Sequence, residues 1–219
     1  KYYDFKERVE MDVKCFDKGI FDSNSYVVWE GNEGVVIDAG VSDEIIMKFI
    51  NENKITIKYI ILTHGHFDHV YYAFKLKEKT GAKVIIHKDD NDMLPKPEWN
   101  GTRFFGDPVS FDLADETVED KDTITVGNLK FEVLHTPGHS MGSMCLRVEN
   151  RLFSGDTLFR LSCGRTDLLG GNQEDLDNSF REKILTLDDN ILVYPGHGES
   201  TTVGFERFSN PYVKYLQKK

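Results

Sequence analysis

Cysteine is scarce in this sequence, and the cysteines that occur do not form an obvious pair. Cys15, Cys145 and Cys163 are odd in number, widely spaced, and include no Cys-x-x-Cys pattern. A disulfide framework needs an even, clustered set, and such frameworks belong to oxidising compartments. We therefore expect a reduced chain, with the cytoplasm as its location.

Long hydrophobic segments are also missing. The longest apolar runs, such as residues 59–62, have the length of a strand. A helix that spans a bilayer needs about 20 apolar residues, so no membrane partner is expected. The first residues, KYYDFKERVEM, are charged and contain no apolar signal region, so no export signal is expected either.

Positive charge is not in excess. The 219 residues include 27 Lys and Arg against 37 Asp and Glu, for a formal net charge of −10. Nucleic acids are bound by concentrated basic surfaces, so the composition argues against a nucleic-acid partner. The length suffices for one domain with a sizeable core. We predict a single domain over residues 1–219, in two halves of about 1–120 and 121–219.

Short β-rich runs recur along the chain, and each ends in a turn or loop. Strands are expected at residues 25–30, 34–38, 59–62, 83–87, 123–125, 130–134, 144–148, 151–153 and 191–193, and helices at 44–54, 70–79 and 173–185. Residues 89–122 are rich in Pro, Asp and Gly and predict a long excursion, whose length suggests function or unrecognised elements. Strands in both halves favour two sheets packed face to face under helices, while periodicity alone gives α/β or α+β.

The densest group of polar side chains directly follows the expected strand at 59–62. It is Thr63-His64-Gly65-His66-Phe67-Asp68-His69, with four metal-binding side chains within six residues. Burying so many unpaired polar groups in a core would be costly. On a turn at a strand end, these side chains can point toward two centres. A solvated His-rich loop is the alternative for this motif alone.

Two further histidines follow strands in the same way. The tripeptide Pro-Gly-His occurs at residues 137–139, in TPGHS, and at 195–197, in YPGHG. Pro and Gly favour a tight turn that projects the next side chain from the sheet edge. Between them lies Ser154-Gly155-Asp156-Thr157, whose Gly-Asp pair is weak evidence alone but stands at another expected strand end.

Together the motifs supply five imidazoles and two carboxylates: His64, His66, Asp68, His69, His139, Asp156 and His197. This combination suits zinc, iron or manganese. Seven ligands are too many for one four-coordinate ion, whereas two ions about 3.5–4 Å apart, sharing a carboxylate and a water, use them all. We therefore predict a catalytic site with two metal ions, with Zn²⁺ favoured over Fe and Mn.

The set THGHFDH, TPGHS, SGDT and PGHG resembles the metallo-β-lactamase-fold superfamily, especially its short, single-domain glyoxalase II-like (hydroxyacylglutathione hydrolase-like) members. The resemblance runs from NSYVVWEGNEGVVIDAG, residues 24–40, to His197, and so covers nearly the whole chain. It implies an α+β fold, a four-layer αββα sandwich, with the metals at one edge of the two sheets.

The resemblance also implies roles for single residues. His64, His66 and His139 would bind the first metal; Asp68, His69 and His197 would bind the second; Asp156 would bridge them. Asp38, at the end of VVID, resembles an outer-shell acid that orients a ligating imidazole. A plain turn aspartate is an equally good interpretation of that residue.

The activity implied by the resemblance is hydrolysis of a thioester such as a hydroxyacylglutathione, through attack by a hydroxide that bridges the metals. We expect no carboxy-terminal helical domain of the kind that binds glutathione, because only about twenty residues follow His197. The residues Val70-Tyr71-Tyr72 depart from the family's small residues. A small-molecule thioester or ester is the expected partner, and the oligomeric state stays open.

Two alternatives remain within the superfamily. Persulfide dioxygenases use one iron held by two His and one Asp, which here would be His64, His139 and Asp156. The stretch CGRTD at 163–167 resembles their loop, whereas the following LLGGN is closer to the short hydrolases and favours hydrolysis. A lactonase or other ester hydrolase, β-lactamase included, is the third possibility.

Other residues allow a functional and a structural interpretation. We interpret His87 and His135 as structural or hydrogen-bonding, and Cys163 as an inert thiol. Arg165 either anchors a substrate carboxylate through its planar guanidinium or holds its own loop together. The aromatic residues of the excursion either roof a pocket or pack the loop: Trp99, Phe104 and Phe105.

Overall fold

The computed structural model describes residues 10–218, so most of the segment KYYDFKERVEM lies outside the described residues. The strands of the first half are β1 Asp12–Phe16, β2 Ser25–Glu30, β3 Glu33–Ile37, β4 Thr56–Leu62, β5 Lys83–His87 and β6 Glu116–Val118. They form one six-stranded sheet in the order β1-β2-β3-β4-β5-β6. Strands β3, β4, β5 and β6 run parallel, and β1, β2 and β3 pair antiparallel.

A second six-stranded sheet comes from the later residues. Its strands are β7 Thr123–Val126, β8 Leu129–His135, β9 Met144–Val148, β10 Arg151–Gly155, β13 Leu192–Pro195 and β14 Thr201–Thr202. Their order is β14-β13-β10-β9-β8-β7, and a small hairpin of β11 Leu158–Phe159 and β12 Ser162–Cys163 lies outside the sheet.

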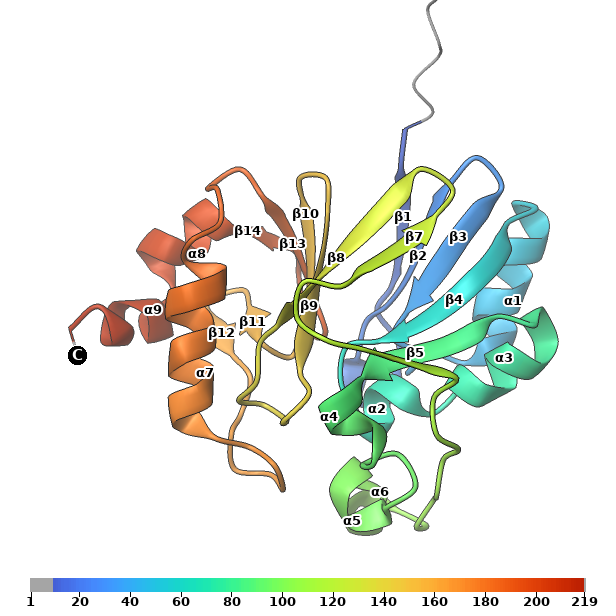
Figure 1. Ribbon diagram of the computed structural model, residues 1–219, viewed down its shortest axis with the longest axis horizontal. Helices are drawn as coiled ribbons and strands as arrows, with labels where there is room; N and C mark the ends of the chain where they lie inside the picture. The colour runs from blue at the N-terminus through green and yellow to red at the C-terminus, as the bar shows by residue number, and fades with distance from the viewer. Residues whose placement is uncertain (1–9, 219) are drawn as a thin grey trace, which may run out of the picture.

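Helices cover the outer face of each sheet (Figure 1). The helices associated with the first sheet are α1 Asp43–Glu52, α2 Phe67–Val70 and α3 Ala73–Thr80. The second sheet is covered by α7 Gln173–Ser179, the π-helical turn η2 Phe180–Ile184, α8 Val203–Ser209 and α9 Pro211–Leu216. The remaining helices are short: η1 Ile20–Asp22, α4 Lys88–Asn91, α5 Pro97–Asn100 and α6 Thr102–Phe105.

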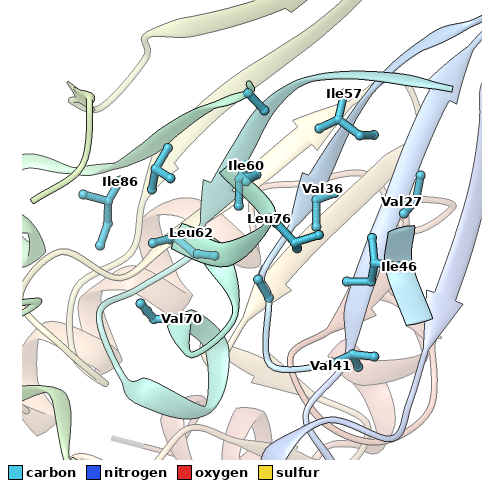
Figure 2. Packing of buried hydrophobic residues seen from close by; sticks show 14 of the residues in the cluster. Val27, Val36, Val41, Ile46, Ile57, Ile60, Leu62, Val70, Leu76 and Ile86 are labelled. Carbon is cyan, nitrogen blue, oxygen red and sulfur yellow. The ribbon is translucent and has the colours of Figure 1, made fainter. Parts of the chain in front are cut away.

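Alternating side chains divide the core into three clusters. On β4, Ile60 and Leu62 face the helices, in the same cluster as Ile46 of α1 and Leu76 of α3 (Figure 2). Ile61, between them, faces the second sheet. Successive side chains of a strand point to opposite faces, so a strand covered on both sides is apolar at every position. Each fully buried Ile or Leu contributes about 1.5–3 kcal/mol.

The second sheet repeats this arrangement. Phe131 and Phe153 face the first sheet, while Leu152 faces the helices and packs with Phe180 and Val213. The layers therefore run helix, sheet, sheet, helix. This confirms the predicted α+β fold with four αββα layers.

The predicted helix at 70–79 is wrong in extent. The chain forms α2 and α3 instead, separated by Tyr71 and Tyr72. The break has a hydrogen-bonding cause, because the Tyr72 N–H donates to the Ala39 carbonyl, and the Asp68 carbonyl accepts from Ser23 Oγ. The helical ladder is thereby replaced by bonds to the loop that follows β3.

The excursion at 89–122 is not a plain loop. It contains most of α4, all of α5 and α6, and the edge strand β6. Its folding depends on Asn100, whose amide donates to the carbonyls of Leu94 and Val109 and whose oxygen accepts from Thr102. Four-residue helices leave no detectable periodicity, which explains why the sequence did not predict them.

Across residues 10–218, no helix combines the length and the apolarity needed to cross a membrane.

Candidate metal centre

Four loops that follow β4, β8, β10 and β13 meet at one edge of the sandwich. Strands β10 and β13 are parallel, and β8 runs with them because each of β8 and β10 pairs antiparallel with β9. Their carboxyl ends therefore share an edge. Two hydrogen bonds join the loops there, from Met144 N–H to the Thr63 carbonyl and from Gly196 N–H to the Gly155 carbonyl.

The seven side chains that the sequence singles out as ligands all lie at this edge. They fall into overlapping groups whose ligand atoms lie within 4.8 Å of one another: His64, His66 and His139; His64, His69 and Asp156; and Asp68, His69 and His197. Within the first group, His66 Nδ1 lies 2.9 Å from His139 Nε2. Within the last, His69 Nε2 lies 3.2 Å from His197 Nε2.

Asp156 lies between the two outer groups. Its Oδ1 is 3.3 Å from His69 Nε2, and its Oδ2 is 3.5 Å from His139 Nε2 and 3.6 Å from His197 Nε2. Asp68 faces only one group, with Oδ2 3.2 Å from His197 Nε2 and 3.5 Å from His69 Nε2. The positions of the two carboxylates fit one bridging and one terminal ligand.

Hydrogen bonds behind the imidazoles fix which ring nitrogen faces the centre. His139 Nδ1 donates to the Arg165 carbonyl over 2.8 Å, because a carbonyl can only accept. His69 Nδ1 lies 2.9 Å from Asp38 Oδ2 and donates to that carboxylate. His64 Nδ1 is 3.1 Å from Thr63 Oγ1, which itself donates to Asp38. In all three rings the Nε2 lone pair is left for a ligand.

Two buried atoms at the centre, His64 Nε2 and Asp156 Oδ1, have no hydrogen-bond partner. An unsatisfied buried polar group costs about 1–3 kcal/mol. Because both atoms are electron-pair donors that face the same space, a cation satisfies them together. The donor set therefore fits divalent metal ions, and imidazole with carboxylate matches zinc, iron or manganese.

The pKa shifts of three of the candidate ligands, His64, His66 and Asp156, also fit metal binding. Burial lowers the pKa of His64 well below its usual value and the pKa of His66 to about 3, so both rings are neutral. For Asp156, burial acts to raise the pKa, but His69, His139 and His64 outweigh it and hold the carboxyl ionised. For His69, burial is outweighed by Asp156, Asp68 and Asp38, which raise its pKa, so a metal ion at its Nε2 would have to displace a proton.

The glycines of the two Pro-Gly-His motifs are required by close packing. A Cβ on Gly196 would lie 2.2 Å from Asp156 Oδ1 and 2.8 Å from His69 Cε1. A Cβ on Gly138, whose φ is +139°, would lie 2.5 Å from Leu176. Only glycine lets each turn approach its neighbour while the next histidine points inward.

Asp38 connects the strand end to the centre. Its Oδ1 accepts from Thr63 N–H, and its Oδ2 accepts from Thr63 Oγ1 and faces His69 Nδ1. Its backbone has φ +56°, a left-handed conformation that is uncommon outside glycine. These contacts favour the interpretation of Asp38 as an outer-shell acid over that of a plain turn residue.

Replacing Asp38 by Asn is therefore expected to weaken metal binding and turnover by about 10–100-fold, because the amide no longer fixes the tautomer of His69. Titration with Zn²⁺ against a competing chelator measures the affinity. Asp112→Asn, at an exposed carboxylate of the excursion, is the matched control and is expected to change neither quantity. Equal affinities for both variants would contradict the role of Asp38.

Asp90 is a site residue that the sequence did not reveal. It is buried at α4, and its carboxylate accepts from Gly65 N–H, Ser140 Oγ and Gly142 N–H at 2.6–2.9 Å. It thus joins the loop of His64 and His66 to the loop of His139. The partners are 25–52 residues away, so no local signal marks Asp90.

His87 and His135 form a second, smaller cluster with Asp89. Their rings stack in parallel, 3.9 Å apart between centroids and tilted by 13°. Imidazole lone pairs lie in the ring plane, so stacked rings do not direct them at one ion. The bonds of His87 Nδ1 with Asp89 N–H and of His135 Nε2 with the Met141 carbonyl support the structural interpretation.

This stack predicts a pH dependence of stability. Burial, followed by the neighbouring His135, lowers the pKa of His87 to about 4. The unfolded chain, with a His pKa near 6.5, therefore binds the proton first, and stability is lost as the pH falls below that value. Between pH 7 and 5, the wild type is expected to lose about 2 kcal/mol more than His87→Asn. Urea unfolding in the presence of a chelator measures the difference, and parallel pH slopes would contradict it.

Arg165 lines the pocket beside the centre, and Cys163 packs against the core of the second sheet; neither contributes a ligand side chain. The Arg165 guanidinium pairs with Asp167 through two bonds of 2.6 and 2.8 Å. This geometry favours the interpretation in which Arg165 holds its loop together, and its carbonyl positions His139. Burial raises the pKa of Cys163 to about 11, which suits an unreactive thiol.

Comparison with known proteins agrees with the fold and the ligand pattern. The sequence model of the metallo-β-lactamase superfamily matches residues 19–197, and the chain belongs to that superfamily of metallo-hydrolases. A relative, the hydroxyacylglutathione hydrolase GloC of Haemophilus influenzae, is 32% identical over 93% of this chain and 98% of its own.

The solved structures that are similar to this chain include the following three. The BLEG-1 B3 metallo-β-lactamase has a TM-score of 0.88 and 36% identity, covering 92% of this chain and 99% of its own. TTHA1623 in a di-iron-bound form has a TM-score of 0.82 and 31% identity, covering 91% of this chain and 99% of its own. ETHE1 from Myxococcus xanthus has a TM-score of 0.73 and 27% identity, over 92% and 84%.

Proposed function

We propose that this protein is a hydrolase that cleaves a small-molecule thioester with the help of two divalent metal ions. The observation that carries the proposal is the pair of ligand groups with Asp156 between them. The similarity to a hydroxyacylglutathione hydrolase over nearly the full length of both chains supports the thioester. Zn²⁺ is the proposed metal, although a similar structure holds two irons.

One ion would be held by His64, His66 and His139. The other would be held by Asp68, His69 and His197, and Asp156 would be a ligand of both. Bound there, the ions would lower the pKa of a water toward about 7 and polarise the thioester carbonyl. The carboxylates of Asp68 and Asp156 line the adjacent pocket, where they can accept the hydrogen bonds and the proton of the attacking water. A bond would form between the water oxygen and the carbonyl carbon, the bond between that carbon and sulfur would break, and the products would be a carboxylate and a thiolate.

Turnover of a panel by the metal-loaded protein tests the proposal. The panel contains S-lactoylglutathione, simple acyl thioesters, a lactone and a β-lactam, the last because a similar structure is a β-lactamase. Thioesters are expected to give the highest kcat/KM. Turnover restricted to the lactone or the β-lactam would replace the thioester by that substrate class.

A mononuclear iron persulfide dioxygenase is the second candidate. The similarity to ETHE1 supports it, together with the stretch CGRTD at 163–167. His64, His139 and Asp156 would hold the iron. Oxygen consumption with glutathione persulfide by the iron-loaded protein distinguishes this candidate from the hydrolase.

A further inference from the structure

A cavity of about 220 Å³ opens directly beside the metal centre. Its floor includes the ligands His66, Asp68, His139, Asp156 and His197. Its walls come from four other parts of the chain, namely η1, the first residue of α2, the excursion with α5 and α6, and the loop at residues 165–169. The side chains of these walls determine which substrate arm fits next to the scissile bond.

The walls are mainly aromatic and aliphatic: Phe21, Phe67, Trp99, Phe104, Phe105, Leu168 and Leu169. Phe105 stacks on Phe67 with ring centroids 5.7 Å apart. Phe21 meets both rings edge-on, with its centroid 5.5 Å from that of Phe67 and 5.1 Å from that of Phe105. The three rings form one continuous apolar wall. Phe21 and Phe105 nevertheless stay 57% and 53% exposed, so apolar surface is left for a ligand to cover.

The backbone at Phe21 is strained as well. Phe21 has φ +54° and ψ +35°, a left-handed conformation that is unfavourable for an aromatic residue. Such strain persists only where the surrounding structure imposes it, and it concentrates at ligand sites. Here the strained residue places its ring at the mouth of the cavity.

Charge is scarce in the same walls. Among residues 10–218, Arg165 is the one cationic side chain that lines the cavity, and its guanidinium is already paired with Asp167. Glu98 is the wall's carboxylate and lies 3.3 Å from Arg103. A substrate arm with several carboxylates would find no unpaired Lys or Arg among the side chains that line this cavity.

We propose that the cavity takes an uncharged apolar arm, aliphatic or aromatic, of the thioester substrate, in place of a carboxylate-bearing thiol such as glutathione. This inference rests on the proposed thioester hydrolysis and names its substrate class. The apolar arm can belong to the acyl group or to the thiol, since both flank the scissile carbonyl–sulfur bond.

Two substrate series for the zinc-loaded enzyme test the proposal and separate the two arms. N-acetylcysteamine thioesters from acetyl to hexanoyl vary the acyl arm, and acetyl thioesters of ethanethiol to hexanethiol vary the thiol arm. In one of the series, kcat/KM is expected to rise about fourfold per methylene. The preferred member should exceed S-lactoylglutathione by at least about tenfold. Flat series, or a preference for S-lactoylglutathione, would overturn the apolar arm while leaving the hydrolase in place.

A pair of variants locates the effect. In the preferred series, kcat/KM for the six-carbon substrate is divided by kcat/KM for the two-carbon substrate. Phe105→Ala is expected to lower this ratio by about tenfold, because it removes one ring of the wall. Phe208→Ala is the matched control, since Phe208 is 70% exposed and does not line the cavity. An equal ratio in both variants would overturn the assignment of the wall.

Binding gives a readout that does not depend on turnover. The chain has two tryptophans, so Trp29→Phe leaves Trp99, in the cavity wall, as the single tryptophan, which can be excited selectively over the tyrosines. Methyl ketones with alkyl chains of increasing length serve as analogues of the thioesters that cannot be hydrolysed. They are expected to change the fluorescence of Trp99, and the concentration that gives half of the change is expected to fall as the chain lengthens. If no thioester is turned over but this trend is found, the proposed reaction fails and the apolar site stands. Binding independent of chain length would overturn the site itself.

Discussion

Replacing Asp156 by Asn is expected to lower kcat/KM by about a thousandfold or more and to reduce the bound metal from about two ions per chain. Asp156 faces both ligand groups, with Oδ1 toward His69 and Oδ2 toward His139 and His197. The amide keeps the shape of the side chain but loses the charge that offsets two cations. Elemental analysis and steady-state kinetics measure the two effects.

Asp167→Asn provides the control for this variant. Asp167 is exposed and pairs with Arg165, the residue whose carbonyl positions His139. Its replacement is expected to leave the metal content unchanged and kcat/KM within about threefold, because exposed ion pairs contribute little. Two retained metals with near-normal turnover in Asp156→Asn would contradict a bridging role for that carboxylate.

Asp90→Ala is expected to have the largest effect on stability, about 3–5 kcal/mol of unfolding free energy. The change leaves Gly65 N–H, Ser140 Oγ and Gly142 N–H without the buried acceptor that they share. For a chain of this size, the expected fall in Tm is about 10 °C. Metal affinity should fall as well, because the two loops of the first ligand group are no longer joined.

Asp92→Ala, on the exposed side of the same segment, separates this effect from damage to α4. We expect that variant to stay within about 0.5 kcal/mol of the wild type. Thermal unfolding of metal-free and metal-loaded protein gives both quantities. Equal melting temperatures for the two variants would show that Asp90 does not hold the loops together.

The clustering of the candidate ligands could be predicted because their signal is local. His64, His66, Asp68 and His69 are adjacent in sequence, and each Pro-Gly-His turn directly follows an apolar strand. The structure brings all seven side chains to one edge of the sandwich. The burial of each sheet on both of its faces could also be predicted, from continuous apolar runs such as those of β3 and β4.

Other parts could not be predicted because their causes are distant or short. The edge strand β1 has three exposed and two half-buried positions and none that is buried, so it lacks the apolar alternation that marks a strand. The helices α4, α5 and α6 are four residues each. Asp90 acts through partners on two other loops. The break between α2 and α3 depends on hydrogen bonds to Ala39 and Ser23, which no helical pattern encodes.

Metal identity and stoichiometry most directly test the central claim, that the seven ligands hold two ions for hydrolysis. The measurement is elemental analysis of protein purified without added metal. About two ions per chain, as zinc or a zinc–iron pair, is the predicted result. A single iron per chain would contradict the dinuclear hydrolase and favour the dioxygenase held by His64, His139 and Asp156.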